Sequence, residues 1–402
     1  MQIAGIIVEY NPLHYGHLHL MREIRDRLGA DAAVVCAMSG NFVQRGDFAV
    51  AGKHPRGEAA VKSGADLVLE LPLPWAVSSA ERFADGGVQV LSATGLVTHL
   101  AFGSECGDGP ALAEVAACLN SEPYHAGLGR FLDKGMSFAA CRQAVVQELL
   151  GPEKAALLNG PNNNLGVEYC KALLRRGSDI RPLTVQRAGM GHNGQGPRKG
   201  PLPATLIREA LRLGEPASAL SEMAPAMADI YQAEEAAGRA PVFLENCQRA
   251  ILARLRSMSE DDFAALDQGR EGLYHRLYQA SRTAVSVDEV CQAAKTKRYA
   301  YARLRRMVLW AYLGLTPADF PAEVPYLRVL AANGTGRALL ARMRKTAALP
   351  VLTKPADVRL LSEEARRLFA AEARATDLYA LAYPDLTASA AGTEWTRGPV
   401  IL

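Results

Sequence analysis

The chain has 402 residues, of which 49% are hydrophobic and 22% charged, and its formal net charge is +3. This ordinary globular composition excludes a disordered chain, and the length suggests two or three domains. No apolar stretch is long enough to span a membrane, and the N-terminus does not resemble a secretory signal. The seven cysteines are widely spaced without a Cys-x-x-Cys pair. We therefore expect a cytoplasmic protein without a disulfide framework or a zinc site.

Charge is unevenly distributed along the chain. Residues 1–150 carry 11 basic and 16 acidic side chains, whereas residues 151–402 carry 34 basic and 26 acidic ones. A polyanionic partner is therefore expected to meet the second part of the chain.

The first part alternates between short apolar runs and helical spacing. Buried strands are expected at residues 3–9 and 32–38, and further strands at 66–71, 99–102 and 180–186. Helices are expected at 16–28, 56–63, 78–93 and 165–175. Strand and helix alternate at about 30 residues per unit, which is typical of a parallel sheet with helices on both faces. We assign residues 1–205 to a Rossmann-like α/β domain.

The second part is dominated by alanine, leucine and arginine with helical spacing. Helices are expected at residues 205–213, 223–237, 247–258, 261–265, 273–281, 287–295, 300–313 and 363–379. We assign residues 206–402 to a mainly α-helical C-terminal region. The segment 189–203 is too rich in glycine and proline for regular structure, and a loop of that length is often functional.

The strongest chemical signal follows the first expected strand and opens the first helix. There the chain reads EYNPLHYGH, with His14, Gly16 and His17 at the turn. The carboxyl ends of strands are where open α/β sheets bind ligands, and a helix N-terminus favours phosphate. Glycine lets the backbone approach a ligand, while two imidazoles can donate hydrogen bonds to a reacting phosphate. The pattern indicates nucleotidyl transfer, and we expect His14 and His17 to be the catalytic residues.

A metal pair and two surface histidines are the alternatives at this motif. A metal site is disfavoured because no third ligand of suitable spacing is evident, so no metal-ligating residue is assigned.

This motif resembles the His-x-Gly-His nucleotidyltransferase superfamily. Further segments resemble one family within it, the bacterial tRNA(Met) cytidine acetate ligases: MSGNFVQRGDFAV, GADLVLELPLPWAVSSAERFADGGV, FGSECGD, GPNNNLGVEY, KTKRYAYARLRR, PYLRVL and the tail GTEWTRGPVIL. The resemblance runs from Ile3 to about Leu330 and includes that tail.

The resemblance implies a reaction in two steps. ATP and acetate give acetyl-adenylate and pyrophosphate, and the acetyl group then passes to N4 of the wobble cytidine of elongator tRNA(Met). The implied partners are ATP, acetate and this tRNA, with no membrane. Mg²⁺ is expected with ATP because it neutralises phosphate charge, although no carboxylate is clearly its ligand.

The resemblance also implies which residues bind ATP. The expected contacts are Ile7, Val8, Glu9, Tyr10, Asn11, Pro12, Leu13, His14, Tyr15, Gly16, His17, Leu18, His19, Leu20, Gly103, Asn162, Asn163, Arg187, Thr205 and Arg208.

Several of these residues have structural alternatives. Gly103 can be a left-handed turn glycine, and Asn162 or Asn163 can cap a helix, since three asparagines stand where the family usually shows two. Arg187 can be a solvated charge, although its guanidinium suits phosphate. Thr205 can be a helix N-cap, because Ala204 replaces a serine of the superfamily's Ser-Ser-Thr-x-Ile-Arg motif.

Two further segments have candidate roles in substrate binding. The polar run 39–46 can form the acetate pocket or the path of the cytidine, or it is a structural loop. The segment 295–306 carries six basic residues and no acidic one, and we expect it to bind tRNA through Lys295, Lys297, Arg298, Arg303, Arg305 and Arg306. A solvated helix face, or a contact with the acidic first part, is the alternative. Arg198 and Lys199 are additional candidates for touching tRNA.

Two rival functions remain open at this point. A small-molecule adenylyltransferase of the pantetheine-phosphate or nicotinamide-mononucleotide type leaves the basic helical part unexplained. A non-catalytic RNA-binding protein is disfavoured by the intact His14 and His17.

Overall fold

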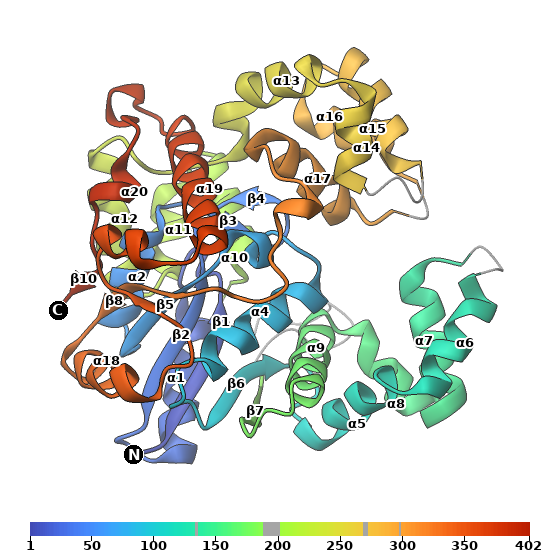
Figure 1. Ribbon diagram of the computed structural model, residues 1–402, viewed down its shortest axis with the longest axis vertical. Coiled ribbons are helices and arrows are strands. Elements are labelled where there is room, and N and C mark those ends of the chain that lie inside the picture. Colours follow the sequence, from blue (N-terminus) through green and yellow to red (C-terminus); the bar gives the residue numbers. More distant parts are fainter. Residues whose placement is uncertain (133–135, 188–201, 268–271, 297–298) are drawn as a thin grey trace.

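The computed structural model describes residues 1–132, 136–187, 202–267, 272–296 and 299–402. Within these residues one mixed sheet has the strand order β10-β8-β5-β2-β1-β6-β7, and β9 pairs with β8 (Figure 1). Its strands are β1 (Ile3–Val8), β2 (Ala33–Ser39), β5 (Leu67–Leu71), β6 (His99–Ser104), β7 (Arg181–Gln186), β8 (Leu327–Ala332), β9 (Val351–Leu352) and β10 (Val400–Ile401).

The central strands are buried on both faces. All residues of β1, β2 and β5 are buried, as expected for apolar, β-branched runs in a parallel sheet. Because β1, β2, β5, β6 and β7 run parallel, their carboxyl ends share one edge of the sheet. Val8 pairs with Met38, and Ser39 pairs with Leu71, so the loops after β1, β2 and β5 meet at this edge.

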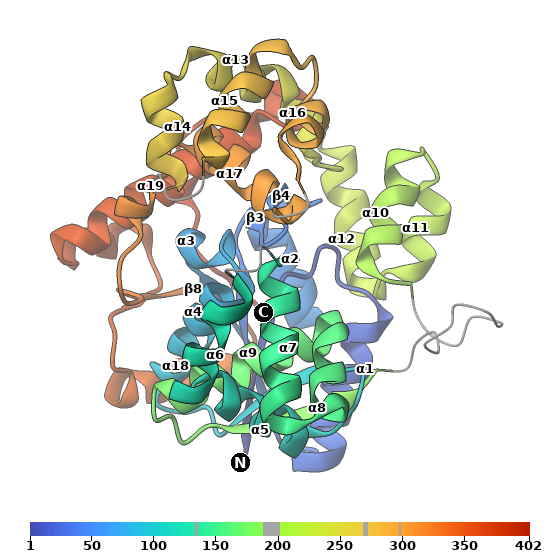
Figure 2. The ribbon, with the colours of Figure 1, turned by 90° about the vertical axis from the view of Figure 1, so that its right-hand side faces the viewer.

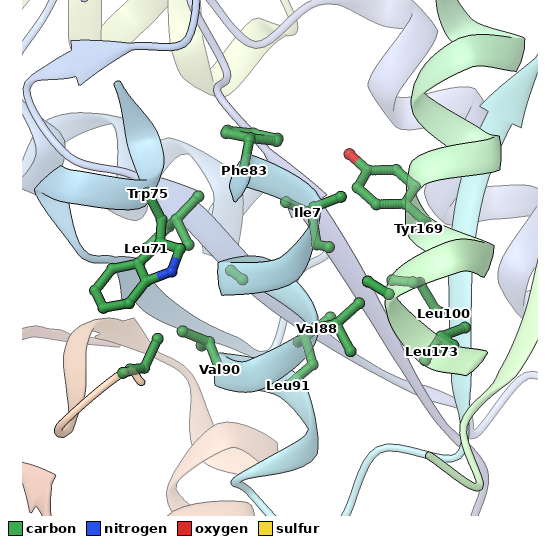
Figure 3. Packing of buried hydrophobic residues seen from close by; sticks show 14 of the residues in the cluster. Ile7, Leu71, Trp75, Phe83, Val88, Val90, Leu91, Leu100, Tyr169 and Leu173 are labelled. Carbon is green, nitrogen blue, oxygen red and sulfur yellow. The ribbon is translucent and has the colours of Figure 1, made fainter. Parts of the chain in front are cut away.

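Helices cover both faces of the sheet. They include α1 (Tyr15–Leu28), α2 (Lys53–Lys62), α3 (Leu73–Ala76), α4 (Ala80–Ser92) and α9 (Pro161–Arg175). Helix α4 packs very closely on β1, because a Cβ on Gly87 would lie 2.5 Å from the Cδ1 of Ile7. Ile7 lies among Val88, Leu91 and Leu100 in this core (Figure 3). This packing fixes the strand that leads into the His-x-Gly-His turn.

A helical arm extends from the sheet on the side of β6 and β7 (Figure 1). It contains α5 (Gly109–Leu119), α6 (Glu122–Leu132), α7 (Phe138–Leu150) and α8 (Pro152–Ala156). Helix α5 packs against α9, and this contact connects the arm with the sheet.

The second part of the chain is mainly helical, as predicted. Its helices are α10 (Ala204–Arg212), α11 (Pro216–Glu222), α12 (Pro225–Ala236), α13 (Gln248–Ser257), α14 (Glu260–Asp267), α15 (Leu273–Thr283), α16 (Val287–Ala294), α17 (Tyr301–Leu313), α18 (Gly334–Thr346), α19 (Glu363–Ala380) and α20 (Thr393–Thr396). Helices α13 to α17 form a lobe beyond the carboxyl edge of the sheet (Figures 1 and 2).

A small hairpin joins the two parts of the molecule. It consists of β3 (Phe42–Val43) and β4 (Asp47–Phe48), from the polar run after β2. Phe42 and Phe48 belong to the same apolar cluster as the helices of the lobe, including Tyr312 on α17. The lobe is therefore docked on residues that follow the second strand.

The predicted α/β fold with a mostly parallel sheet and a mainly helical second part is confirmed. One feature was not predicted: β8, β9 and β10 come from the second part and extend the sheet, with β8 antiparallel to β5. Strands of the sheet therefore lie on both sides of the expected domain boundary between residues 205 and 206.

Candidate active site

The His-x-Gly-His turn lies between the carboxyl end of β1 and the start of α1. His14 is the N-cap of α1 and is buried, and its backbone N–H donates to the Nδ1 of His17 at 3.1 Å. The backbone N–H of Gly16 donates to the Nδ1 of His14, also at 3.1 Å. The two rings lie with their centroids 3.9 Å apart. The imidazoles therefore cap the helix that they open.

These hydrogen bonds define the protonation state of both histidines. An Nδ1 that accepts an N–H carries no proton, so a neutral ring has its proton on Nε2. Burial, and secondarily the charge of Arg187, lowers the pKa of His14 to about 4. Burial, then His14 and Arg187, lowers the pKa of His17 well below its usual value. Near pH 7 both rings are neutral and each has an Nε2–H to donate.

The segment before His14 is held firmly by its surroundings. Tyr10 is buried and has a positive φ of 47°, a sparsely populated backbone state for a residue other than glycine. The carbonyl of Asn11 accepts a 2.6 Å hydrogen bond from Nη1 of Arg208. On the other side, the N–H of Ala224 donates to the carbonyl of Leu13 at 3.1 Å. Residues of the second part thus help to position the turn.

Arg56 holds the loops after β1 and β2 together. Its side chain is fully buried and donates to the carbonyls of Glu9, Ser39, Gly40 and Ala51. A buried guanidinium that satisfies several carbonyls fixes their relative positions. The sequence context of this arginine, shortly after the polar run 39–46, does not distinguish it from a surface charge.

Gly103 and Arg187 lie together at the carboxyl ends of β6 and β7. A Cβ on Gly103 would lie 3.0 Å from the Cγ of Arg187, and the N–H of Arg187 donates to the carbonyl of Ser104 at 2.9 Å. Gly103 is a strand residue and is not among the described glycines with a positive φ. The left-handed turn alternative for Gly103 is therefore wrong, and its lack of a side chain instead makes room for Arg187.

Comparison with known proteins shows the family to which the chain belongs. A family model described as HIGH Nucleotidyl Transferase matches residues 1–394. The tRNA(Met) cytidine acetate ligase of Acetivibrio thermocellus is 35% identical over 416 aligned residues, covering 100% of both chains. The enzyme of the same name from Caldanaerobacter subterraneus subsp. tengcongensis is 35% identical, covering 97% of each chain. The chain belongs to the tRNA(Met) cytidine acetate ligase family.

A solved structure within the family provides a direct comparison of the fold. The crystal structure of Thermotoga maritima TmcAL bound with alpha-thio ATP matches with a TM-score of 0.93 at 31% identity and covers 100% of both chains. The apo form of that protein matches with a TM-score of 0.94 at 32% identity. The predicted resemblance to the cytidine acetate ligase family is confirmed.

Asn162 and Asn163 lie in the first turn of α9, close to the loop after β6. Glu105 accepts both of their backbone N–H groups, at 3.0 and 2.6 Å, while the Oδ1 of Asn163 accepts from the N–H groups of Glu105 and Cys106. Although burial opposes it, the hydrogen bonds from the two asparagines lower the pKa of Glu105. Their alternative role as helix caps is wrong, since the N-cap is Gly160 and Glu105 satisfies the free N–H groups.

Thr205 is an exposed residue in the first turn of α10. The N-cap of this helix is Pro203 and makes no side-chain capping bond, so the alternative that Thr205 caps the helix is wrong. Arg208, one turn further along, reaches the His-x-Gly-His segment through Asn11, as described above. The loop with Arg198 and Lys199 lies outside the described residues.

The basic segment 295–306 divides into two groups. Arg305 lies 3.1 Å from Oδ1 of Asp47, and Arg306 donates to the carbonyl of Gln44 at 3.2 Å. These two side chains thus contact the β3–β4 hairpin, which is the intramolecular alternative considered above. Lys295 is exposed and lies 5.9 Å from the ring of Tyr301, whereas Lys297 and Arg298 lie outside the described residues. Arg303 is half-buried beside Tyr299.

The polar run 39–46 contains both structural and unexplained groups. The side chain of Asn41 accepts from the N–H of Lys53 and donates to Thr376, so it serves the structure. Ser39 is fully buried, and neither its Oγ nor the Nε2 of Gln44 has a hydrogen-bond partner among the described residues.

A buried ionic group lies beyond this run, at the carboxyl end of β5. Lys53 lies 2.7 Å from Glu70 and 2.5 Å from Glu394, and Arg328 pairs with both carboxylates. The familial tail that contains Glu394 is thereby fixed to the strands of the sheet.

The described residues give no sign of a protein-bound metal or of a membrane segment. They contain no group of three or more His, Cys, Asp or Glu side chains placed to hold a metal ion. No helix within them is long and apolar enough to cross a membrane.

Proposed function

We propose that this protein activates acetate with ATP and transfers the acetyl group to N4 of the wobble cytidine of elongator tRNA(Met). One observation carries the proposal: two neutral histidines present Nε2–H groups at the start of α1, in a chain that matches proteins named tRNA(Met) cytidine acetate ligase over its full length. The name of these relatives supports tRNA and acetate as substrates, and the bound analogue in the solved relative supports ATP.

The first step is adenylyl transfer. A carboxylate oxygen of acetate attacks the α-phosphorus of ATP, an O–P bond forms, and pyrophosphate leaves with the electrons of the broken P–O bond. His14 and His17 donate their Nε2–H groups to the charge that develops on the phosphates, and the positive end of α1 adds to this stabilisation. Arg187, exposed at the same edge, supplies a guanidinium for phosphate oxygens.

The remaining ATP contacts follow the family's binding stretch, residues 7–20, with Gly103, Asn162, Asn163, Thr205 and Arg208. The absence of a side chain at Gly103 leaves room for Arg187, and Arg208 positions Asn11 through a hydrogen bond to its carbonyl. A Mg²⁺ ion bound with ATP would neutralise charge on the phosphates. The described residues contain no group of three or more His, Cys, Asp or Glu side chains placed to hold it.

The second step is acyl transfer to RNA. N4 of cytosine is a poor nucleophile, and the mixed anhydride with AMP supplies the reactivity that free acetate lacks. The tRNA is held by the basic segment 295–306, in which the side chain of Lys295 is exposed. Lysine and arginine contacts with phosphates provide most of the affinity.

Acetate-dependent exchange of labelled pyrophosphate into ATP, measured without tRNA, tests the first step. We expect exchange with acetate and none without it. Exchange that requires a phosphopantetheine or a mononucleotide instead of acetate would favour the small-molecule adenylyltransferase.

A further inference from the structure

Two buried hydrogen-bond donors, each on a residue next to Glu9, have no partner among the described residues. They are the Nε2 of Gln44 and the Nε of Arg208. A buried donor without an acceptor costs about 1–3 kcal/mol, so such atoms commonly mark a site where a ligand supplies the acceptor. The first step, as proposed above, does not use the side chain of Gln44.

Hydrogen bonds and charge place the two residues that carry these donors next to Glu9. The backbone N–H of Gln44 donates to Oε1 of Glu9 at 2.8 Å. Arg208 donates to Asn11, two residues after Glu9, and its charge acts on the Glu9 carboxylate. The carbonyl of Gln44 accepts from Arg306, so its backbone is held on both sides. Glu9, Gln44 and Arg208 thus come from the loop after β1, the β3–β4 hairpin and α10, and they are neighbours at the carboxyl end of β1.

This point lies at the edge of the sheet where the acetyl group is activated. Glu9 follows β1 directly, and five residues later His14 opens α1. The nucleophilic amine must approach the acetyl-adenylate at this edge. A wobble base can reach it because the anticodon loop is single-stranded and its bases can be splayed out.

We propose that Glu9, Gln44 and Arg208 form the pocket that recognises the target cytosine. The Watson–Crick edge of cytosine presents the N4 amino donor beside two acceptors, N3 and O2. The cytosine pocket, as we call these three residues, offers the complementary set: one carboxylate acceptor and two donors. Uracil presents an acceptor at O4 and a donor at N3, so it meets this set with the wrong polarity. The inference rests on the proposed function and specifies which residues select its RNA substrate.

The same carboxylate can receive the proton released in the second step. N4 attacks the carbonyl carbon of acetyl-adenylate, a C–N bond forms, and the C–O bond to the phosphate breaks with its electron pair leaving on AMP. One N4 proton passes to Glu9. Burial raises the pKa of Glu9, although the N–H of Gln44 and the charges of Arg208, Arg45 and Arg56 act against the shift. The raised pKa makes this carboxylate a stronger base than an exposed one.

Atom substitution in the RNA tests whether the side chain of Gln44 contacts the target base. Preformed acetyl-adenylate is mixed with tRNA(Met) transcripts that carry cytidine, 3-deazacytidine or 2-thiocytidine at the wobble position, and the transfer rate is measured in a single turnover. We expect the wild-type protein to lose about 5- to 100-fold on the analogue whose altered atom Gln44 contacts, because such a contact is worth about 1–3 kcal/mol.

The variants Gln44→Ala and Gln44→Met lack the amide, and Gln44→Met keeps the side-chain length. With the cytidine transcript, both variants should transfer the acetyl group more slowly than the wild-type protein, by about the factor that the analogue costs the wild-type protein. Replacing cytidine by that analogue should then slow the variants by less than about twofold, because the contact is already lost. If both variants remain as sensitive as the wild-type protein to both analogues, Gln44 does not read the base and the proposal is overturned. Gln232→Ala, at an exposed position of α12, is the matched control and should behave as wild type.

A second variant tests the role of Glu9. Transfer by the wild-type protein should rise with pH as Glu9 loses its proton, whereas Glu9→Gln should be slow and lack that rise. If the transfer rate of Glu9→Gln depends on pH in the same way as that of the wild-type protein, Glu9 is not the proton acceptor. Acetate-dependent pyrophosphate exchange by the wild-type protein is measured alongside: its absence would refute the proposed function, whereas its presence with base-insensitive transfer would refute the cytosine pocket alone.

Discussion

The side chain of Arg187 occupies the space that a Cβ on Gly103 would need, since that atom would lie 3.0 Å from the Arg187 Cγ. Gly103 lies on β6, Arg187 directly follows the neighbouring parallel strand β7, and a larger residue at position 103 must displace Arg187. The proposed ATP site is thus coupled to the pairing of β6 and β7, and a small substitution at Gly103 reports on the role of Arg187.

Gly103→Ala should move Arg187 without unfolding the chain, because the crowded atoms belong to a flexible side chain. We expect the KM for ATP in pyrophosphate exchange to rise about tenfold, as for the loss of one charge-assisted hydrogen bond of about 1.5 kcal/mol. Gly129→Ala is the matched control, because nothing lies within 4 Å of its added Cβ. An unchanged KM in Gly103→Ala would exclude Arg187 from ATP binding.

His14→Ala or His17→Ala should abolish most acetyl-adenylate formation while tRNA binding persists. Each removes one Nε2–H donor, which is worth about 3 kcal/mol, or about a hundredfold in rate. Pyrophosphate exchange measures the effect, with His125→Ala, at an exposed position of α6, as the control. Exchange at the wild-type rate in either variant would remove that histidine from the mechanism.

Replacing Lys295, Lys297 and Arg298 together with alanine should weaken tRNA binding and flatten its salt dependence. Each lost phosphate contact should remove about 0.7 to 0.9 from the log–log slope. Filter binding at several salt concentrations measures this. An unaltered slope would mean that these residues form only a solvated surface.

Arg305→Ala should behave differently from that triple variant. Its guanidinium contacts Asp47 and the carbonyl of Gly46, so the loss falls on the docking of α17 against the hairpin. We expect a loss of about 2 kcal/mol in the free energy of unfolding, measured by urea titration. A wild-type stability with a reduced salt slope would instead place Arg305 on the tRNA.

Glu394→Gln should destabilise the fold in a pH-dependent manner. Burial opposes ionisation, but the charges of Lys53 and Arg328 lower the pKa of Glu394 to about 2. A depressed carboxyl pKa stabilises the fold above the unfolded value of about 4.3, and that contribution is lost as the pH falls towards 2. Removing one partner of a buried ionic group costs about 3–5 kcal/mol. The difference in unfolding free energy between wild type and variant should therefore shrink below pH 4, and a constant difference would contradict this account.

The sequence allowed prediction of the elements that carry local signals. Alternation of β-branched runs with helical spacing identified β1, β2, β5, β6 and β7, and the His-x-Gly-His turn was expected where the structure has it. Strand β8 was missed because a six-residue segment with one arginine, in a helical context, has no local feature that shows its pairing with β5, more than 250 residues earlier. Helical periodicity in 300–313 likewise did not reveal that Arg305 and Arg306 face the hairpin.

The central claim is acetate-dependent modification of one cytidine. The most direct measurement incubates the protein with ATP, labelled acetate and Mg²⁺ plus a tRNA(Met) transcript, digests the RNA and identifies the labelled nucleoside by mass spectrometry. The account predicts label in N4-acetylcytidine at the wobble position, and none in a transcript with uridine there. Absence of label from the RNA, despite acetate-dependent pyrophosphate exchange by the same preparation, would contradict it.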